Sequence, residues 1–143
     1  MKRFRLLILL ASLIFFISCD DSNNKNKNEH ICPQCNMPFS INEYSSTYKD
    51  IKFDDIGCMI LWAKDKHIDL NKIETQIYIN DKKKYINSKK AYYKINGKTP
   101  MNYGFVAYEN NCDECIVFEE VVLRMLRGEH LANPKIRKKV LGY

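Results

Sequence analysis

The residues best suited to chemistry lie in one short segment, Cys32-Pro33-Gln34-Cys35-Asn36-Met37. Two thiols three residues apart can converge on one metal ion, and Met37 adds a thioether. Thiolate and thioether ligands together suit a soft ion, above all Cu(I), whereas Zn(II) takes thiolates but rarely a thioether. Copper therefore explains a methionine that zinc leaves unexplained, and the spacing predicts a soft-metal site.

Further candidate ligands lie on either side of this segment. His30 precedes Cys32 by two residues and offers an imidazole. Met101 lies in a predicted loop that enters a strand, so its thioether is available as a ligand. Met59 and Met125, in contrast, share the apolar faces of predicted helices and are expected in the core.

Other interpretations of the cysteines remain open. Cys112 and Cys115 form a second pair at the same spacing, and with Cys32 and Cys35 they could build a Cys₄ zinc site. Either pair could instead close a local disulfide, which is the first choice for Cys112 and Cys115, or take part in thiol–disulfide exchange. Cys58, within a predicted helix, is expected to be a buried free thiol.

The N-terminus has the pattern of an export signal. Residues 1–5 are basic, and the apolar run over 6–17 is too short for a permanent membrane span, which needs about 20 residues. Ser18-Cys19 at its end resembles a bacterial lipobox. We therefore expect a signal peptide over 1–18, lipid on Cys19 and a polar tether over 19–29. Asp20 and Asp21 resemble an inner-membrane retention signal, which favours the periplasmic side of that membrane.

Composition limits the class of protein. The 143 residues suit one domain or two very small ones, and they exclude a large multidomain enzyme. Without Lys2, Arg3 and Arg5 of the signal, the net charge falls from +6 to +3, which does not argue for nucleic-acid binding. Neither a nucleophile motif nor a phosphate-binding loop is recognisable, so we expect a binding protein and not an enzyme.

Strands and two short helices must position the candidate ligands. Asp54 and Asp55 offer N-cap chemistry to a helix that begins at Ile56, and Asn96-Gly97 is a hairpin turn signal. The mixture indicates an α+β domain over 30–134, built from two similar ββαβ-like halves and followed by a loose basic tail over 135–143. The strands are predicted at 48–53, 75–80, 91–95, 104–108 and 116–118, and the second helix at 119–127.

Three segments together resemble the NosL family, copper-chaperone lipoproteins that assist nitrous oxide reductase. They are CPQCNM at residues 32–37, FDDIGCMILW at 53–62 and TPMNYGFVAY at 99–108. With the lipoprotein signal, the resemblance covers about residues 1–110. Residues 111–143 match less well, and the pair Cys112 and Cys115 departs from the family pattern.

The resemblance implies Cu(I) binding and delivery to the copper centre of that reductase or to its assembly proteins. Carried over by position, Cys35 and Met37 match the family's Cys-x-Met, and Met101 matches a later methionine. Some members have a histidine where this chain has Asn42, so Cys32 and His30 are the candidates for the remaining ligands.

Overall fold

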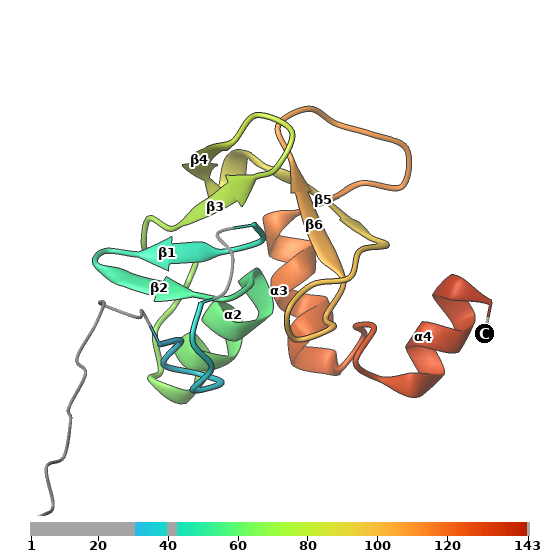
Figure 1. Ribbon diagram of the computed structural model, residues 1–143, viewed down its shortest axis with the longest axis horizontal. Coiled ribbons are helices and arrows are strands. Elements are labelled where there is room, and N and C mark those ends of the chain that lie inside the picture. Colours follow the sequence, from blue (N-terminus) through green and yellow to red (C-terminus); the bar gives the residue numbers. More distant parts are fainter. Residues whose placement is uncertain (1–30, 40–42, 143) are drawn as a thin grey trace, which may run out of the picture.

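The computed structural model describes residues 31–39 and 43–142 (Figure 1). The predicted signal peptide over 1–18, the tether over 19–29, and the candidates Cys19 and His30 lie outside these ranges. Among the described residues, no helix is both long enough and apolar enough to cross a membrane.

The described residues form two antiparallel sheets and three α-helices, which confirms the α+β class. The larger sheet has the strand order β2-β1-β3-β4, and the smaller has the order β6-β5-β7. The chain order is β1 (Ser46–Tyr48), β2 (Ile51–Phe53), α2 (Ile56–Asp65), β3 (Gln76–Ile79), β4 (Lys84–Asn87), the 3-10 helix η2 (Ser88–Lys90), β5 (Tyr92–Ile95), β6 (Phe105–Tyr108), β7 (Ile116–Val117), α3 (Phe118–Arg127) and α4 (Pro134–Leu141).

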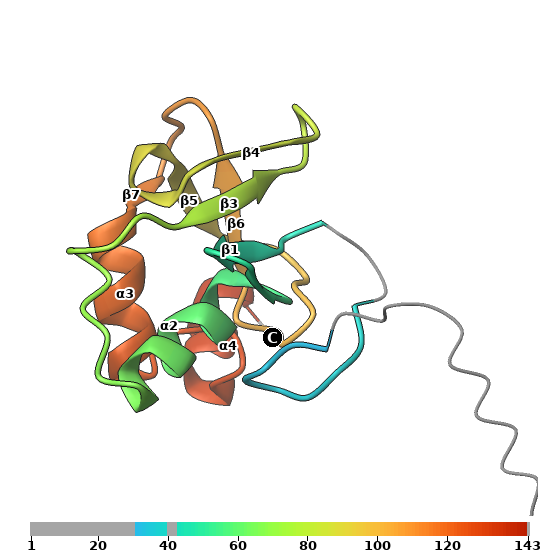
Figure 2. The same ribbon diagram turned by 90° about the vertical axis from the view of Figure 1, so that its left-hand side faces the viewer.

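The two halves share one core. Helices α2 and α3 pack against each other, and Figure 2 shows both helices on the same side of the sheets. Phe53, Met59, Tyr93 and Phe118 are fully buried between these layers. The first half has the ββαβ order β1–β2–α2–β3 before β4, whereas the second half runs β5–β6–β7 and then α3.

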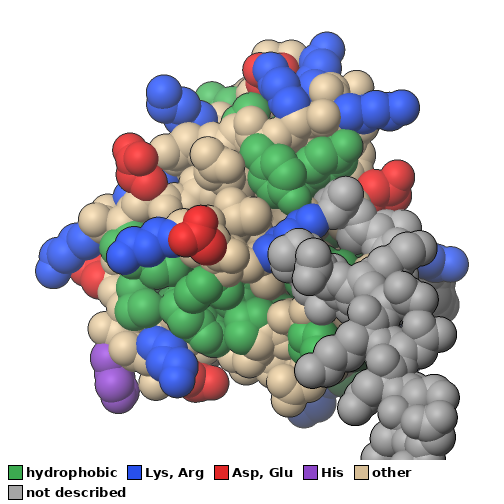
Figure 3. All heavy atoms as spheres, turned by 60° about the vertical axis from the view of Figure 1, so that its left-hand side comes forward, with side chains coloured by type: hydrophobic (Ala, Val, Ile, Leu, Met, Phe, Trp, Pro, Cys, Tyr) green, Lys and Arg blue, Asp and Glu red, His purple; other side chains and the backbone are tan. Residues whose placement is uncertain are grey.

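A partly apolar surface lies on the side of the β1–β2 hairpin. Figure 3 shows hydrophobic side chains gathered on this face, with lysines and acidic residues around them. Half-buried Tyr48 and Trp62 contribute to it, with ring centroids 6.1 Å apart. Lys49 lies over the Tyr48 ring at 5.2 Å.

One strand prediction and one turn prediction differ from the structure. The single strand predicted over 48–53 is a hairpin, because the chain reverses at Lys49, whose φ is +52°.

Asn96 and Gly97 do not form a two-residue turn, since both backbone N–H groups donate to the Gly104 carbonyl, at 3.1 and 3.2 Å. A longer loop, which carries Met101, therefore joins β5 to β6. A Cβ at position 97 would lie 2.1 Å from Val106 Cγ2, so Gly97 permits a close approach of the two strands.

The prediction of a loose tail is wrong, because residues Pro134–Leu141 form helix α4. Pro134 stands at the start of the helix, where its missing N–H costs nothing. The side chain of Asn133 caps that end by accepting from the Lys135 N–H at 3.1 Å. Gly142, with a φ of +80°, closes the other end. Local capping therefore orders a segment that the charge pattern alone describes as a tail.

Candidate metal centre

The first part of the site is a tight loop around Cys32. Ile31 and Pro38 form an isolated antiparallel bridge, so the chain folds back on itself. The Cys32 N–H donates to the Met37 carbonyl at 3.0 Å, and the Asn36 N–H donates to the Cys32 carbonyl at 2.9 Å. Asn36 adopts a left-handed φ of +59°, which asparagine tolerates better than most residues. The turn brings Cys35 back towards Cys32.

The second part is the start of α2, where two adjacent aspartates follow β2. Asp55 is the N-cap, and its Oδ1 accepts from the Cys58 N–H at 3.1 Å, as the sequence predicts. This cap places Cys58 in the first turn of the helix, where the positive end of the helix dipole favours thiolates. Asp54 lies beside the Cys32 loop, and its Oδ2 accepts from the Cys35 thiol at 3.0 Å.

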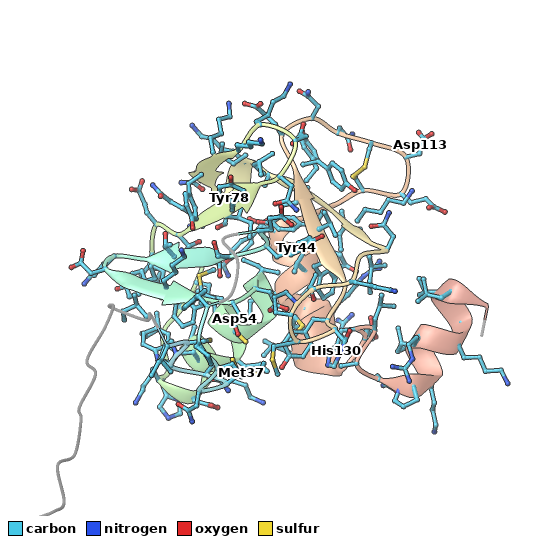
Figure 4. The ribbon with its side chains drawn as sticks, in the orientation of Figure 1. Met37, Tyr44, Asp54, Tyr78, Asp113 and His130 are labelled. Atoms are coloured by element: carbon cyan, nitrogen blue, oxygen red, sulfur yellow. A yellow bond between two sulfur atoms is a disulfide. The ribbon has the colours of Figure 1, made fainter. Side chains whose placement is uncertain are left out.

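These two parts meet in a cluster of three sulfurs, the cysteine cluster Cys32, Cys35 and Cys58. Their Sγ atoms all lie within 4.8 Å of one another, so the cluster could hold a metal ion. Cys32 and Cys58 are 0% exposed, whereas Cys35 is half-buried. Figure 4 shows sulfur atoms close to the labelled Asp54 and Met37 at this end of the domain.

Cys32 is the anionic member of the cluster. A hydrogen bond from the Cys58 thiol lowers its pKa to about 5, with help from the backbone N–H groups of Asp54 and Cys35 and against the effect of burial. The same hydrogen bond, together with burial, raises the pKa of Cys58. The two buried sulfurs therefore share one proton, which stays on Cys58.

Cys35 is held as a thiol. Burial, followed by the hydrogen bond to Asp54, raises its pKa to about 12. A metal ion bound by all three sulfurs would displace the protons of Cys35 and Cys58, because thiolates are the ligating form. Binding is therefore expected to release protons.

The loop over residues 99–104 packs against the start of α2. Burial raises the pKa of Asp55 to about 6, and the backbone N–H of Cys58, followed by the Thr99 hydroxyl and the Met101 N–H near the carboxylate, partly offsets this effect. Tyr103 covers Gly57 so closely that a Cβ there would lie 2.2 Å from the tyrosine Cδ2. Only glycine at position 57 allows this approach, which brings the backbone of Met101 beside the helix that carries Cys58.

The structure brings some predicted ligands together and separates others. Cys32 and Cys35 share the cluster, and the Met37 N–H hydrogen-bonds to the Cys35 sulfur, with the Met37 side chain 40% exposed. Met101 lies next to the cluster through its backbone contact with Asp55. His30 lies outside the described residues.

The other cysteine pair lies elsewhere. Cys112 and Cys115 form a disulfide, with their Cα atoms 5.1 Å apart. Figures 1 and 4 show its loop, marked by Asp113, at the end of the domain opposite Asp54 and Met37. The four cysteines of the alternative zinc site are therefore not brought together.

Sequence reasoning missed the role of Cys58. The residue is buried and free, as predicted, but it also completes the cysteine cluster. The signal was present in Asp54-Asp55-Ile56-Gly57-Cys58, because a cysteine three residues after an N-cap lies in the first turn of its helix. What the pattern lacked was the contact between that turn and the Cys32 loop.

Comparisons with protein-family models, curated proteins and solved structures found no match. The resemblance to the NosL family thus stays a prediction from the residues of the chain. The geometry establishes a possible metal centre of three cysteine sulfurs at the start of α2, in a small α+β domain.

Proposed function

We propose that this protein is a membrane-anchored copper chaperone that binds Cu(I) at the cysteine cluster and passes it to a partner. The observation that carries the proposal is the convergence of Cys32, Cys35 and Cys58, whose sulfurs lie within 4.8 Å of one another. Three thiolates form a site for a soft ion, and an anionic Cys32 prepares it for a cation.

Copper is favoured over zinc by the number and kind of donors. Structural zinc sites are almost always four-coordinate, with nitrogen, oxygen or thiolate ligands. The described residues that gather here offer three cysteine sulfurs, and the neighbouring residues Met37 and Met101 could add thioethers. Thioethers select soft ions such as Cu(I), so both methionines support copper.

The graded exposure of the cluster suits a carrier that must release its ion. Cys32 and Cys58 are completely buried, whereas Cys35 is half-buried and Met37 is 40% exposed. An incoming ligand from a partner can therefore reach the ion from the side of Cys35 and Met37. Ligand exchange on that side would leave the buried sulfurs of Cys32 and Cys58 as the last ligands to release the ion.

The recipient and the location come from the sequence. Resemblance to the NosL family points to nitrous oxide reductase, an enzyme of denitrification, or to its assembly proteins. The lipobox at Cys19 implies a lipid anchor, and a tether over 19–29 would keep the domain close to a membrane-associated assembly site. We place the protein on the periplasmic side of the inner membrane, as a binding protein without catalytic activity.

Thiol–disulfide exchange is the second candidate function, because Cys32 has a pKa of about 5. Its geometry opposes that chemistry. An attacking thiolate must reach a disulfide in another protein, yet Cys32 is 0% exposed. The more accessible Cys35 is held protonated, with a pKa of about 12. The reactive form and the accessible position therefore belong to different residues.

A competition titration tests the proposal. The full chain is reduced in detergent and titrated with Cu(I) against a chromogenic chelator. We expect one high-affinity Cu(I) per chain, no such binding after Cys32→Ser with Cys58→Ser, and weaker binding after Met37→Leu with Met101→Leu.

Cys112→Ser with Cys115→Ser is the matched control and should bind copper like the wild type. Preference for zinc under the same conditions, or unchanged copper affinity in the cluster variant, would contradict the proposal. Transfer to the recipient is a separate measurement, in which the loaded protein is mixed with copper-free nitrous oxide reductase.

A further inference from the structure

Helix α4 is capped at both ends, and yet none of its residues is fully buried. Asn133 caps its start and Gly142 closes its end, but none of the residues of Pro134–Leu141 is buried. An isolated helix of fewer than about 12 residues is marginal in water, because nucleation is costly and packing supplies most helical stability. Figure 1 shows α4 standing off from the sheets and from α3. The helix is therefore expected to gain stability from a surface that covers it.

The charge of the chain is concentrated around this helix. Residues 134–143 contain four cations, Lys135, Arg137, Lys138 and Lys139, and no acid. Residues 19–115 contain equal numbers of basic and acidic side chains, so residues 116–143 carry the whole excess of +3. A basic helix of this kind is typical of segments that lie on anionic surfaces.

A groove beside α4 adds cations from two other elements. It has a volume of about 510 Å³, and its lining includes Lys94 of β5, Arg124 of α3 and Lys139 of α4. Two of these cations have acidic partners. Glu114, also in the lining, pairs with Lys94 at 3.2 Å but is 82% exposed, so solvent screens that pair. Arg124 Nε pairs with Glu120 Oε1 of the same helix at 2.7 Å, so the net positive charge of this surface comes chiefly from α4. Val140 lines the groove as well and is 41% exposed, which gives the groove an apolar edge.

We propose that α4 and this groove form a docking surface for anionic phospholipid headgroups. The cations supply attraction to phosphate, their aliphatic stems can lie along the membrane interface, and Val140 offers an apolar contact. This inference is independent of the metal, but it rests on the proposed membrane location of the protein.

The position of α4 in the fold agrees with this role. Figure 1 places α4 and residues 31–39 on opposite sides of the molecule, both toward its lower edge. Residues 31–39 follow the predicted tether directly, so an anchor at Cys19 would bring that lower edge near the bilayer. Docking of α4 would then orient the domain on the membrane.

Hydrogen exchange on the full chain tests the inference. The protein is reconstituted into nanodiscs of phosphatidylcholine alone or of phosphatidylcholine mixed with phosphatidylglycerol. We expect the amides of α4 to exchange about tenfold more slowly in the anionic discs, and this protection to disappear at high salt because it is electrostatic. Exchange in α2 should be the same in both lipids.

Charge reversal on α4 provides the variant. Lys135→Glu with Lys138→Glu should abolish the lipid-dependent protection, and the glutamate at position 135 lies near the helix start, where the helix dipole tolerates an acid. The matched control is Lys82→Glu with Lys83→Glu, the same charge change in the exposed turn between β3 and β4, which should keep the protection.

Equal exchange of α4 in both lipids would overturn the inference, as would equal loss of protection in the two variants. Protection by an added acidic protein without protection by anionic lipid would also overturn it, since it would assign the surface to a protein partner. If the full chain is recovered without membranes, the proposed location is wrong. The same exchange measurement with added phosphatidylglycerol vesicles then still decides whether α4 binds lipid.

Discussion

Two Cys-x-x-Cys segments in this chain have the same spacing and opposite chemistry. Cys32 and Cys35 are free, and they meet Cys58 at the start of α2. Cys112 and Cys115 lie in a loop at the other end of the domain and form a disulfide. The first pair is surrounded by hydrogen-bond partners from another segment, above all Asp54. The second pair has backbone hydrogen bonds to neighbours within its own loop, to Asn111 and between the two cysteines themselves.

The difference shows that neighbours decide what a pair of cysteines does. In the cysteine cluster, burial and the hydrogen bond to Asp54 hold Cys35 as a thiol, and the Cys58 thiol donates a hydrogen bond to the anionic Cys32. These contacts give each sulfur a separate role before any ion binds. In the other pair, the Cys115 N–H donates to the Cys112 carbonyl at 3.0 Å, and this local turn is enough to close the bridge.

The largest expected contrast is in alkylation. With a pKa of about 12 for Cys35 against 9.0 for an ordinary cysteine, its thiolate fraction at pH 8 is about 1000-fold smaller. We expect iodoacetamide to modify native Cys35 about 1000-fold more slowly than the same residue in the unfolded chain, measured by mass spectrometry.

After mild reduction, Cys112 and Cys115 should be labelled much faster than Cys35. Asp54→Asn should accelerate the labelling of Cys35, because the carboxylate that stabilises the thiol is gone. Rapid labelling of Cys35 in the native wild type would mean that this account of the cluster is incorrect.

The next largest contrast between the cysteine cluster and the disulfide pair is expected in copper affinity. Removing an outer-sphere contact of a metal typically costs 10–100-fold in affinity, so loss of a ligand should cost at least about 100-fold. We expect that reduction for Cys58→Ala in a Cu(I) competition titration. Cys112→Ala with Cys115→Ala serves as its control and should leave affinity unchanged. Equal affinity in Cys58→Ala would remove this residue from the ligand set.

The pH dependence of stability should reveal the buried carboxylate below the cluster. Burial raises the pKa of Asp55 from 3.8 to about 6, so the folded state holds this proton more tightly than the unfolded chain does. Asp55 therefore contributes stability that is full below pH 3.8 and is lost as pH rises through about 6. The full change is on the order of 3 kcal/mol.

Asp55→Asn should lack this dependence while keeping an N-cap acceptor. Urea unfolding of both proteins between pH 4 and 7 measures the difference. Asp113→Asn, an exposed carboxylate beside the disulfide, should behave like the wild type. If the wild type and Asp55→Asn respond alike, the burial of this carboxylate does not control stability in that range.

The smallest effect is expected from opening the disulfide. Only three positions separate Cys112 from Cys115, and so short a loop loses little conformational freedom when it is closed. Cys112→Ser with Cys115→Ser should lower the free energy of unfolding by about 2 kcal/mol, measured by urea unfolding of the metal-free protein. A loss several times larger would show that the bridge also supports the pairing of β7 with β5.

Much of the fold followed from local patterns, and the exceptions have physical causes. The α+β class, the cap at Asp55 and the helix over Phe118–Arg127 agree with the periodicity and capping signals. The hairpin at Lys49 was missed because its turn depends on a left-handed non-glycine residue, which no residue preference marks. Helix α4 was missed because its basic composition outweighed the caps at Asn133 and Gly142.

The sequence by itself determined the kind of donors available, cysteine thiols and the thioethers of Met37 and Met101, and it determined the cap that starts α2. Only the tertiary structure decided which sulfurs meet, because Cys32 and Cys58 lie 26 positions apart and come together through the packing of the Cys32 loop on the end of β2 and the start of α2. It also decided which sulfur carries the charge. A thiol's pKa depends on burial and on the donors around it, and those are properties of the folded chain and not of residue type.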